Sequence, residues 1–520
     1  MTDAALSTPV PSGGTPRAFG WLDRWPVMLL VCLVTIVPLL LVDFPPLVDL
    51  YGHLGRFAVQ TELAQRPELQ PFYSYDWKLI GNLGGDILVE VLHPLLGLEA
   101  SVHAVVILTQ IVGALGLMLV SREIHGRVTP FALAAIPLLY GYPFNYGFIN
   151  YSLSMGLALL AYTAWLRLHR QGREGRARLW LLVAGAAIWV CHTYGWAFLG
   201  LLTGSTMLAE VYAARMRPVR AVARILGACW PLLLPVVPMV IWRAESSGAG
   251  LGGWSLPFKL IWSYSPFRSV WKVLDIGALA VVAGLICWGL LRRAARFDPA
   301  VGIAAALCVA FFLILPSWVF GSAFADMRLL PYGIALGLVA IGTGQGRARE
   351  LRIAGMIALA FFGVRMAVTS AGFVLQDREM QAALPALDHM PKGARVAFFV
   401  IKPCKVRWTL PVLDHAAGAA LARRNAFVND QWQQPGVNPM RVHYAQGGRF
   451  VKDPSHLVLS DACGPSVLPP VSKTLAKLPR SAFTHVWIVG YRPERYTVPE
   501  GFVEVPGSGS GRLYRIEPQG

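Results

Sequence analysis

Residues 25–56 of the chain read WPVMLLVCLVTIVPLLLVDFPPLVDLYGHLGR. The first part, Trp25–Val42, is long and apolar enough for a membrane span, and Pro45 and Pro46 end it. Arg24 precedes this run as in a signal peptide, but no small-residue cleavage site follows it. We therefore interpret it as an uncleaved membrane anchor that is followed at once by a polar segment.

The composition of the whole chain indicates a polytopic membrane protein. Of 520 residues, 55% are hydrophobic and 14% are charged, and the mean hydropathy is +0.51. Ordinary soluble domains are about 45–50% apolar and about 25% charged. The net charge of +17 lies mostly in short loops between apolar runs, not on a continuous basic face. We therefore expect membrane lipids and no nucleic acid as partners.

Apolar runs predict an α-helical protein with about 11 transmembrane helices. They lie near residues 25–42, 101–120, 129–142, 148–166, 179–195, 197–214, 225–243, 273–291, 299–316, 329–343 and 353–372. The stretch 179–214 is too long for one helix, so we divide it near His192–Gly195. Asp86–Leu98 is too short to cross, and its polar residues recur on one face, which predicts a helix in the membrane interface.

Arginines predict the orientation of the helices. Basic loops alternate with loops poor in Lys and Arg, and they contain Arg122, Arg127, Arg167, Arg170, Arg173, Arg176, Arg178, Arg215, Arg217, Arg220, Arg224, Arg292, Arg293, Arg296, Arg347, Arg349 and Arg352. The positive-inside rule then places the N-terminus in the cytoplasm. We expect residues 1–24 to be a disordered cytoplasmic tail and 25–372 a transmembrane domain, whose first outer loop, 43–100, carries juxtamembrane helices.

Residues 373–520 predict a small extracytoplasmic α/β domain. Its strand-like runs are Arg395–Ile401, His456–Leu459 and His485–Val489. Pro506–Gly511 predicts a hairpin turn, since it lacks the Lys-Ser/Thr ending of a phosphate loop. Cys404 and Cys463 either form a disulfide in an oxidising compartment or are unrelated thiols. No CxxC or His-x-x-x-His spacing indicates a structural metal site.

Polar residues beside the predicted spans form five clusters on the predicted outer face. The first contains Asp43 and, six residues later, Asp49. A helix that begins at Asp49 would place Asp49, His53 and Arg56 on one face. A helix cap alone would explain Asp49 but not His53.

Two further clusters combine polar groups with aromatic rings. Asn145 and Asn150 lie among tyrosines and phenylalanines, which are typical of an interfacial belt or of the wall of a carbohydrate pocket. His192 and Tyr194 lie at the outer end of a predicted helical hairpin, where a packing role for the histidine is the alternative.

The last two clusters are an ion-pair candidate and a loop. Asp326 and Arg328 lie at the outer mouth of the tenth predicted span. They either pair with each other, or Arg328 binds a lipid phosphate through charge-assisted hydrogen bonds. The outer loop Glu245–Trp271 is long enough to act as a lid. All five clusters together predict one site at the membrane surface, covered by the first outer loop and the C-terminal domain.

This layout resembles the GT-C superfamily of polytopic glycosyltransferases, which take sugars from polyprenyl-phosphate carriers. In that superfamily an acidic residue follows the first span, before juxtamembrane helices, many further spans and often a C-terminal extracytoplasmic domain. Asp43 and Asp49 occupy the acidic position here, and Gly52–Pro71 and Tyr73–Leu98 that of the juxtamembrane helices. The resemblance covers most of residues 20–372, although the adjacent acidic pair of many members is absent.

The resemblance implies an inverting transferase of the cell envelope in the inner membrane. Its donor would be a polyprenyl-phosphate sugar, its acceptor a glycan, a lipid or a protein, and no covalently bound cofactor is expected. Asp49 would act as the general base at its ordinary pKa, with Asp43 as the other catalytic candidate. Arg328, assisted by Arg56 or His53, would offset charge on the departing phosphate. The sugar would be oriented by Asn145, Asn150 and His192.

Three matters stay open at this point. A divalent ion, held by Asp326, Asp86 or Glu90, could supply part of the positive charge. A transporter or flippase would also need many spans, although Arg365 is the main charge deep in a span and no two related halves are visible. A non-catalytic scaffold for envelope assembly is the third reading.

Overall fold

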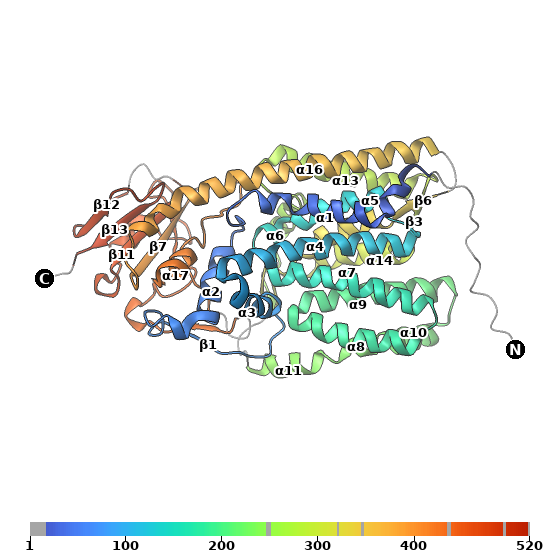
Figure 1. The fold of residues 1–520 in the computed structure, drawn as a ribbon, viewed down its shortest axis with the longest axis horizontal. Helices are drawn as coiled ribbons and strands as arrows, with labels where there is room; N and C mark the ends of the chain where they lie inside the picture. The colour runs from blue at the N-terminus through green and yellow to red at the C-terminus, as the bar shows by residue number, and fades with distance from the viewer. Residues whose placement is uncertain are drawn as a thin grey trace.

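The structure, a computed structural model, describes residues 17–245, 251–319, 322–344, 348–433, 438–491 and 496–517. A long helical part and a C-terminal sheet lie at opposite ends of the molecule (Figure 1). Between them lie the short helices α2 (Leu50–Glu62) and α3 (Gly84–Leu96) and the strand β1 (Tyr73–Tyr75). We call the end of the helices nearest this sheet the sheet end.

The helical part consists of apolar helices that lie side by side. The longer ones are α1 (Trp25–Leu40), α4 (Leu98–His125), α7 (Ile149–Arg170), α8 (Glu174–Cys191), α9 (Thr193–Ala213), α13 (Lys272–Leu291), α14 (Pro299–Ile314), α15 (Leu329–Val339) and α16 (Ala348–Ala383). Glycines let α4 and α7 approach closely, since a Cβ on Gly156 would lie 2.9 Å from the backbone nitrogen of Gly113. Small residues serve the same purpose in other membrane helix pairs.

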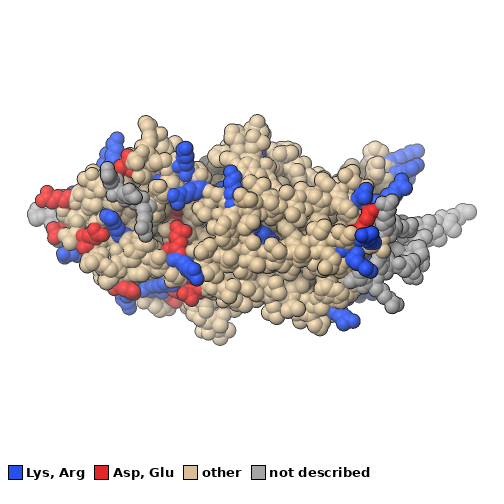
Figure 2. All heavy atoms as spheres, turned by 90° about the horizontal axis from the view of Figure 1, so that it is seen from above, with Lys and Arg blue, Asp and Glu red and all other residues tan. Residues whose placement is uncertain are grey.

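Composition and surface both fit a membrane location. Within the described ranges, the helical segments Leu98–His125, Lys272–Leu291 and Ala348–His389 are long and apolar enough to cross a membrane. Shorter apolar helices are α1, α14 and α15. On the face in Figure 2, Lys and Arg gather at the end opposite the sheet, both signs of charge occur at the sheet end, and few charges lie between.

Several predicted spans differ from the structure. Residues 129–142 do not form one helix but α5 (Pro130–Ala135), η3 (Ile136–Tyr140) and the start of α6 (Tyr142–Asn145). Residues 225–243 are likewise divided among α10 (Pro218–Cys229), η4 (Trp230–Leu233) and α11 (Val236–Glu245). Prolines recur in both stretches, and Pro130, Pro137, Pro218 and Pro231 each stand in the first turn of one of these pieces, where proline favours the start of a new helix over continuation of the preceding one. The total number of spans therefore stays a prediction.

Other boundaries also move. The expected span 329–343 ends as a helix at Val339 and continues as β6 (Ile341–Thr343), which pairs with β3 (Ala295–Phe297). The expected division at residue 372 lies inside α16, whose single helix reaches the C-terminal part.

The N-terminal tail was expected to be disordered to residue 24, and this is wrong for its last part. Residues Arg17–Asp23 form a 3-10 helix, η1. Phe19 packs against Gly355 of α16, and Asp23 pairs with Arg122 at 3.1 Å. Residues 1–16 lie outside the described residues.

The division of 179–214 is confirmed. Helix α8 ends at Cys191, α9 begins at Thr193, and His192 between them has an extended backbone. Helix α3 also confirms the short helix expected over 86–98. The segment from residue 73 to the start of α3 was expected to be helical, and this is wrong. It begins with β1, which pairs with β9 (Met440–Val442) of the C-terminal part.

The C-terminal part folds around a mixed sheet in the order β10-β7-β11-β13-β12, with β8 also paired to β7. Its strands are β7 (Arg395–Lys402), β8 (Phe427–Val428), β10 (Leu457–Leu459), β11 (His485–Gly490), β12 (Phe502–Val505) and β13 (Arg512–Ile516). Helices α17 (Gly418–Arg424) and α18 (Val471–Leu475) accompany them. The three predicted strands are confirmed, and so is the hairpin turn over 506–511, which joins β12 to β13.

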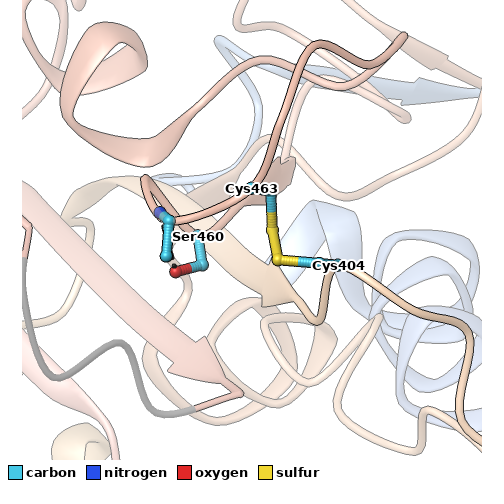
Figure 3. The surroundings of a disulfide bond; sticks show 4 residues. Cys404, Ser460 and Cys463 are labelled. Carbon is cyan, nitrogen blue, oxygen red and sulfur yellow. Dashed lines mark hydrogen bonds between the residues drawn. A yellow bond between two sulfur atoms is a disulfide. The ribbon is translucent and has the colours of Figure 1, made fainter.

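The disulfide that the sequence left open is present. Cys404 and Cys463 are bonded (Figure 3). The backbone nitrogen of Cys463 donates to the carbonyl of Ser460 at 3.0 Å. The bond joins the segment after β7 to the segment after β10, which are neighbouring parallel strands.

Close contacts fix the C-terminal part onto α2. A Cβ on Gly418 of α17 would lie 1.9 Å from the carbonyl oxygen of Tyr51, so only glycine permits this approach. Arg66 donates to the carbonyl of Ala422 at 2.5 Å. The sheet domain is therefore held directly over the segment that begins at residue 49.

Candidate functional site

A cavity of about 1360 Å³ lies where the sheet ends of the helices, the first loop and the C-terminal part meet. Members of all five predicted clusters line it. These include Asp49, His53, Arg56, Asn150, His192, Tyr194, Gly253, Phe258, Trp262 and Arg328. The arginine-rich turns after α7 and α9 lie at the opposite ends of helices whose first residues approach this cavity.

Asp49 holds the N-cap position of α2, but its side chain makes no cap hydrogen bond. The capping explanation therefore does not account for this carboxylate, which lines the cavity instead. Its Oδ1 lies 3.7 Å from Nε2 of His415. Burial, and after it the carboxylates of Asp414 and Asp453, raise the pKa of Asp49 well above its ordinary value, while Arg328 opposes this rise. The ordinary pKa expected from sequence is not the one that this environment produces.

Gly147 fixes the position of Asp49 through the backbone. The amide of Asp49 donates to the carbonyl of Tyr146 at 3.0 Å, and that of Val48 to the carbonyl of Asn145 at 3.1 Å. Gly147 has a φ of +104°, and a Cβ there would lie 2.8 Å from the Cβ of Asp49 and 2.9 Å from its nitrogen. Glycine is required here by conformation and by space.

His53 and Arg56 lie on the cavity wall, as the helical spacing predicts, but neither is a free cation. Burial and then Arg56 lower the pKa of His53 to about 3, so its imidazole is neutral near pH 7. Arg56 forms a buried ion pair with Asp86.

Asp86 is the centre of a small buried network. Besides Arg56, it accepts hydrogen bonds from Tyr75 at 3.0 Å and from Asn150 at 3.1 Å. Burial alone would raise the pKa of Asp86, but Arg56, Asn150 and Tyr75 hold it below its ordinary value. Asn150 thus joins α7 to α3 while its side chain also faces the cavity.

Arg328 is a buried cation of this cavity, and within the described part of the chain it has no carboxylate partner. Its guanidinium lies 4.2 Å from the ring centre of Phe148, with Tyr151 and Tyr194 at 5.6 and 5.3 Å. Nη2 donates to the carbonyl of Ala323 at 2.8 Å, whereas the buried Nε has no partner. Among the described residues, no carboxylate lies within ion-pair distance of it. A guanidinium with a free donor in a desolvated aromatic cage is suited to an anionic ligand.

His192 positions the neighbourhood of this arginine. Its Nδ1 accepts from the backbone nitrogen of Tyr194 at 3.0 Å, so the histidine caps α9. Its Nε2 lies 3.5 Å from Nη1 of Arg328. Tyr194 donates its hydroxyl to the carbonyl of Ala325 at 2.9 Å, which holds the ring over the guanidinium.

Three of the predicted site residues do not line the cavity. Asp43 is exposed beyond the end of α1. Asn145 is buried and donates to the carbonyl of Tyr140 at 2.8 Å, which stabilises the loop. Asp326 pairs with Lys259 at 2.7 Å, so it does not pair with Arg328. Glu90, considered as a metal ligand, accepts from Gln60 instead.

The sequence reasoning missed the C-terminal contribution to the cavity. Asp414, His415, Asp453 and His456, together with Trp432, line it from the side of the sheet. Burial and then Asp414 raise the pKa of Asp453 to about 6. The sequence signal was available, because Asp453-x-x-His456 ends on the first residue of a predicted strand and Asp414-His415 are adjacent.

The opposite wall of the cavity is apolar. It is lined by Leu201, Leu208, Met239, Leu307, Phe311 and Leu315, which come from α9, α11, α14 and the residue after α14. The cavity therefore joins a charged region beside Asp49 to an apolar region between the helices.

Arg365 is not an open charge within a span. It pairs with Asp275 of α13 at 2.7 Å and donates to the carbonyl of Phe267 at 2.6 Å. Trp408 of the C-terminal part donates to the same carboxylate at 2.7 Å. This group joins α16, α13 and the C-terminal part.

No family model and no curated protein matches the chain. Among solved structures, ArnT from Cupriavidus metallidurans in the apo state has a TM-score of 0.49 and 14% identity, covering 96% of this chain and 100% of that one. ArnT from the same organism bound to undecaprenyl phosphate has a TM-score of 0.46 and 14% identity, covering 96% and 99%. Arabinofuranosyltransferase AftD from Mycobacteria has a TM-score of 0.45 and 14% identity, covering 95% and 40%.

At 14% identity these structures do not show a family for the chain, and the GT-C resemblance stays a prediction from the sequence layout. The scores lie below 0.5, so the functional argument that follows rests on the geometry of the cavity.

Proposed function

We propose that the protein is a membrane glycosyltransferase that moves a sugar from a polyprenyl-phosphate carrier to an acceptor hydroxyl. One observation carries the proposal: Asp49 and the unpaired Arg328 line a single cavity that extends into an apolar region between the helices. A lipid-linked phosphate needs both an anion site and an apolar path. Undecaprenyl phosphate, bound in one of the similar structures, is a carrier of this chemical class.

In the proposed reaction Asp49 is the general base. Its carboxylate takes the proton of the acceptor hydroxyl while the oxygen attacks the anomeric carbon. The bond from that carbon to the carrier phosphate breaks on the opposite face, so the configuration inverts. Asp43 lies outside the cavity, which leaves Asp49 as the base among the two acidic candidates of the first loop.

Arg328 would stabilise the departing phosphate. Negative charge grows on that phosphate as the glycosidic bond breaks, and a fixed guanidinium in a desolvated cage stabilises it most in the transition state. Arg56 is paired with Asp86 and His53 is neutral, so Arg328 carries this role among the three residues.

The C-terminal part and the loop through α12 (Leu256–Ser263) would enclose the site. Phe258 and Trp262 line the cavity from α12, and Trp432 lines it from the C-terminal side. Part of the predicted lid, 246–250, lies outside the described residues. We further propose that this side of the protein faces away from the cytoplasm at the inner membrane, as the arginine pattern predicts.

The test is transfer from a radiolabelled polyprenyl-phosphate sugar pool in membranes that contain matched amounts of each variant. Wild type should transfer, and Asp49→Asn and Arg328→Met should not. Asp76→Asn is the matched control, since Asp76 lies in the same loop but is exposed and pairs with Arg441. Transfer that survives both cavity variants would contradict the proposed chemistry, and lack of transfer by wild type from every donor in the pool would contradict the enzyme class.

A further inference from the structure

We propose that His415, Asp453 and His456 bind one transition-metal ion, for which Zn²⁺ is the best match. Each residue offers one ligand atom, and these atoms lie within 4.8 Å of one another. All three side chains line the cavity, beside Asp49. The site goes beyond the proposed function, and binding at it is measured without any transfer assay.

The donor set selects the kind of ion. Imidazole nitrogens favour zinc and neighbouring transition metals, whereas Mg²⁺ and Ca²⁺ favour sites made of oxygens. Two histidines and one carboxylate supply three of the four positions of a tetrahedral zinc ion and leave one position for water or another ligand. Because the three residues line a cavity, that fourth position is open to it.

His415 has the orientation of a metal ligand. Its Nδ1 lies 3.0 Å from the backbone carbonyl of Asp430. A carbonyl only accepts, so Nδ1 carries the proton and Nε2 presents a lone pair. Histidines that bind metals are commonly held in this way by a second hydrogen bond. Nε2 also lies 3.7 Å from Oδ1 of Asp49, which places the lone pair on the cavity side.

His456 supplies an independent observation. Its side chain is fully buried, yet neither ring nitrogen has a hydrogen-bond partner among the described residues. Buried polar groups are nearly always satisfied. Its backbone is fixed by the hydrogen bond from Val400, and its ring stacks on Phe398 with centres 6.1 Å apart. The imidazole is thus held rigidly with two unused nitrogens.

Asp453 completes the set from the same short segment. Its Oδ1 lies 3.8 Å from Nδ1 of His456. Tetrahedral zinc with bonds of about 2.0 Å keeps its ligand atoms about 3.3 Å apart. Small side-chain rotations would therefore bring the ligand atoms to the separation that a bound zinc ion requires. The carboxylates of Asp49 and Asp414 line the same region, so a cation there would also offset their repulsion.

The test measures metal content in the full chain, purified in detergent with a tag that contains no histidine. After chelation and dialysis against Zn²⁺, wild type should retain about one zinc per chain, and His415→Gln and His456→Gln should bind it at least about a hundredfold more weakly. His443→Gln is the matched control, because His443 is an exposed histidine of the same domain. His456→Cys should restore zinc binding, since a thiolate replaces the imidazole as ligand.

Size-exclusion chromatography accompanies each variant, so that loss of folding is not taken for loss of a ligand. If His456→Gln does not fold, thermal unfolding of the wild type becomes the test. The unfolding temperature of the wild type should rise with Zn²⁺ and not with Mg²⁺. Folded wild type without zinc, or folded His415→Gln and His456→Gln with undiminished zinc, would overturn the proposal. Loss of zinc binding in His443→Gln would overturn the proposal as well.

Discussion

Substituting alanine for Gly147 should lower the rate of transfer while leaving the protein folded. The new Cβ would lie 2.8 Å from the Cβ of Asp49, and ordinary contact begins at 3.4 Å, so Asp49 must move by about 0.6 Å. A displacement of 1 Å at a reacting group can cost about a hundredfold in rate, so we expect a loss of at least about tenfold. The positive φ adds about 1–2 kcal/mol of strain to the folded state.

Gly126→Ala separates the two effects. Gly126 also has a positive φ, +72°, but no atom lies within 4 Å of a Cβ there. Both variants should lower the midpoint of thermal unfolding, and only Gly147→Ala should lose sugar transfer at matched protein amounts. Equal transfer by Gly147→Ala and Gly126→Ala would refute the reasoning that Gly147 positions Asp49.

Three further outcomes are expected. Asp86→Asn should lower the free energy of unfolding by about 3–5 kcal/mol, because it leaves Arg56 buried without its charge partner. The pKa of Asp86 is lowered in the fold, so its contribution persists above the ordinary aspartate pKa; the loss in thermal midpoint should be the same at pH 5 and pH 8. Replacing Cys404 and Cys463 by serine should lower the free energy of unfolding of the C-terminal part by about 4 kcal/mol, as expected for a closed loop of 59 residues. The thermal midpoint should fall accordingly, while the helical part stays folded. Arg328→Lys keeps the charge but not the planar fork, so it should lower kcat for transfer more than it raises the KM for the lipid-linked donor; an unchanged kcat would argue against stabilisation of the departing phosphate.

Local sequence signals predicted the features that depend on neighbouring residues. The break at His192 and the strands around β7, β10 and β11 follow from apolar runs and their lengths. The common face of Asp49, His53 and Arg56 follows from helical spacing, and all three residues line the cavity.

What sequence could not provide were contacts between distant segments. Asp326 was expected beside Arg328 as a possible partner, but it forms its ion pair with Lys259 of α12. Asn145 has the composition of a sugar ligand, yet its amide is used by the carbonyl of Tyr140. His415 and His456 line the cavity from segments that lie far from Asp49 in the sequence, and no periodicity in the sequence reveals that α17 packs on α2.

The broken spans show a different limit. Hydropathy measures whether a segment can lie in an apolar environment, but it does not register where prolines interrupt the helix. Residues 130–140 are buried throughout, as their hydropathy requires, and yet they form two short helical pieces.

The most direct test of the central claim is single-turnover transfer by purified protein from a defined polyprenyl-phosphate sugar, with Asp49→Asn beside wild type. The account predicts an inverted anomeric product from wild type and a rate about 10²–10⁴-fold lower for Asp49→Asn, with donor binding little changed. Retention of configuration, or a rate loss below about tenfold, would contradict the assignment of Asp49 as the general base.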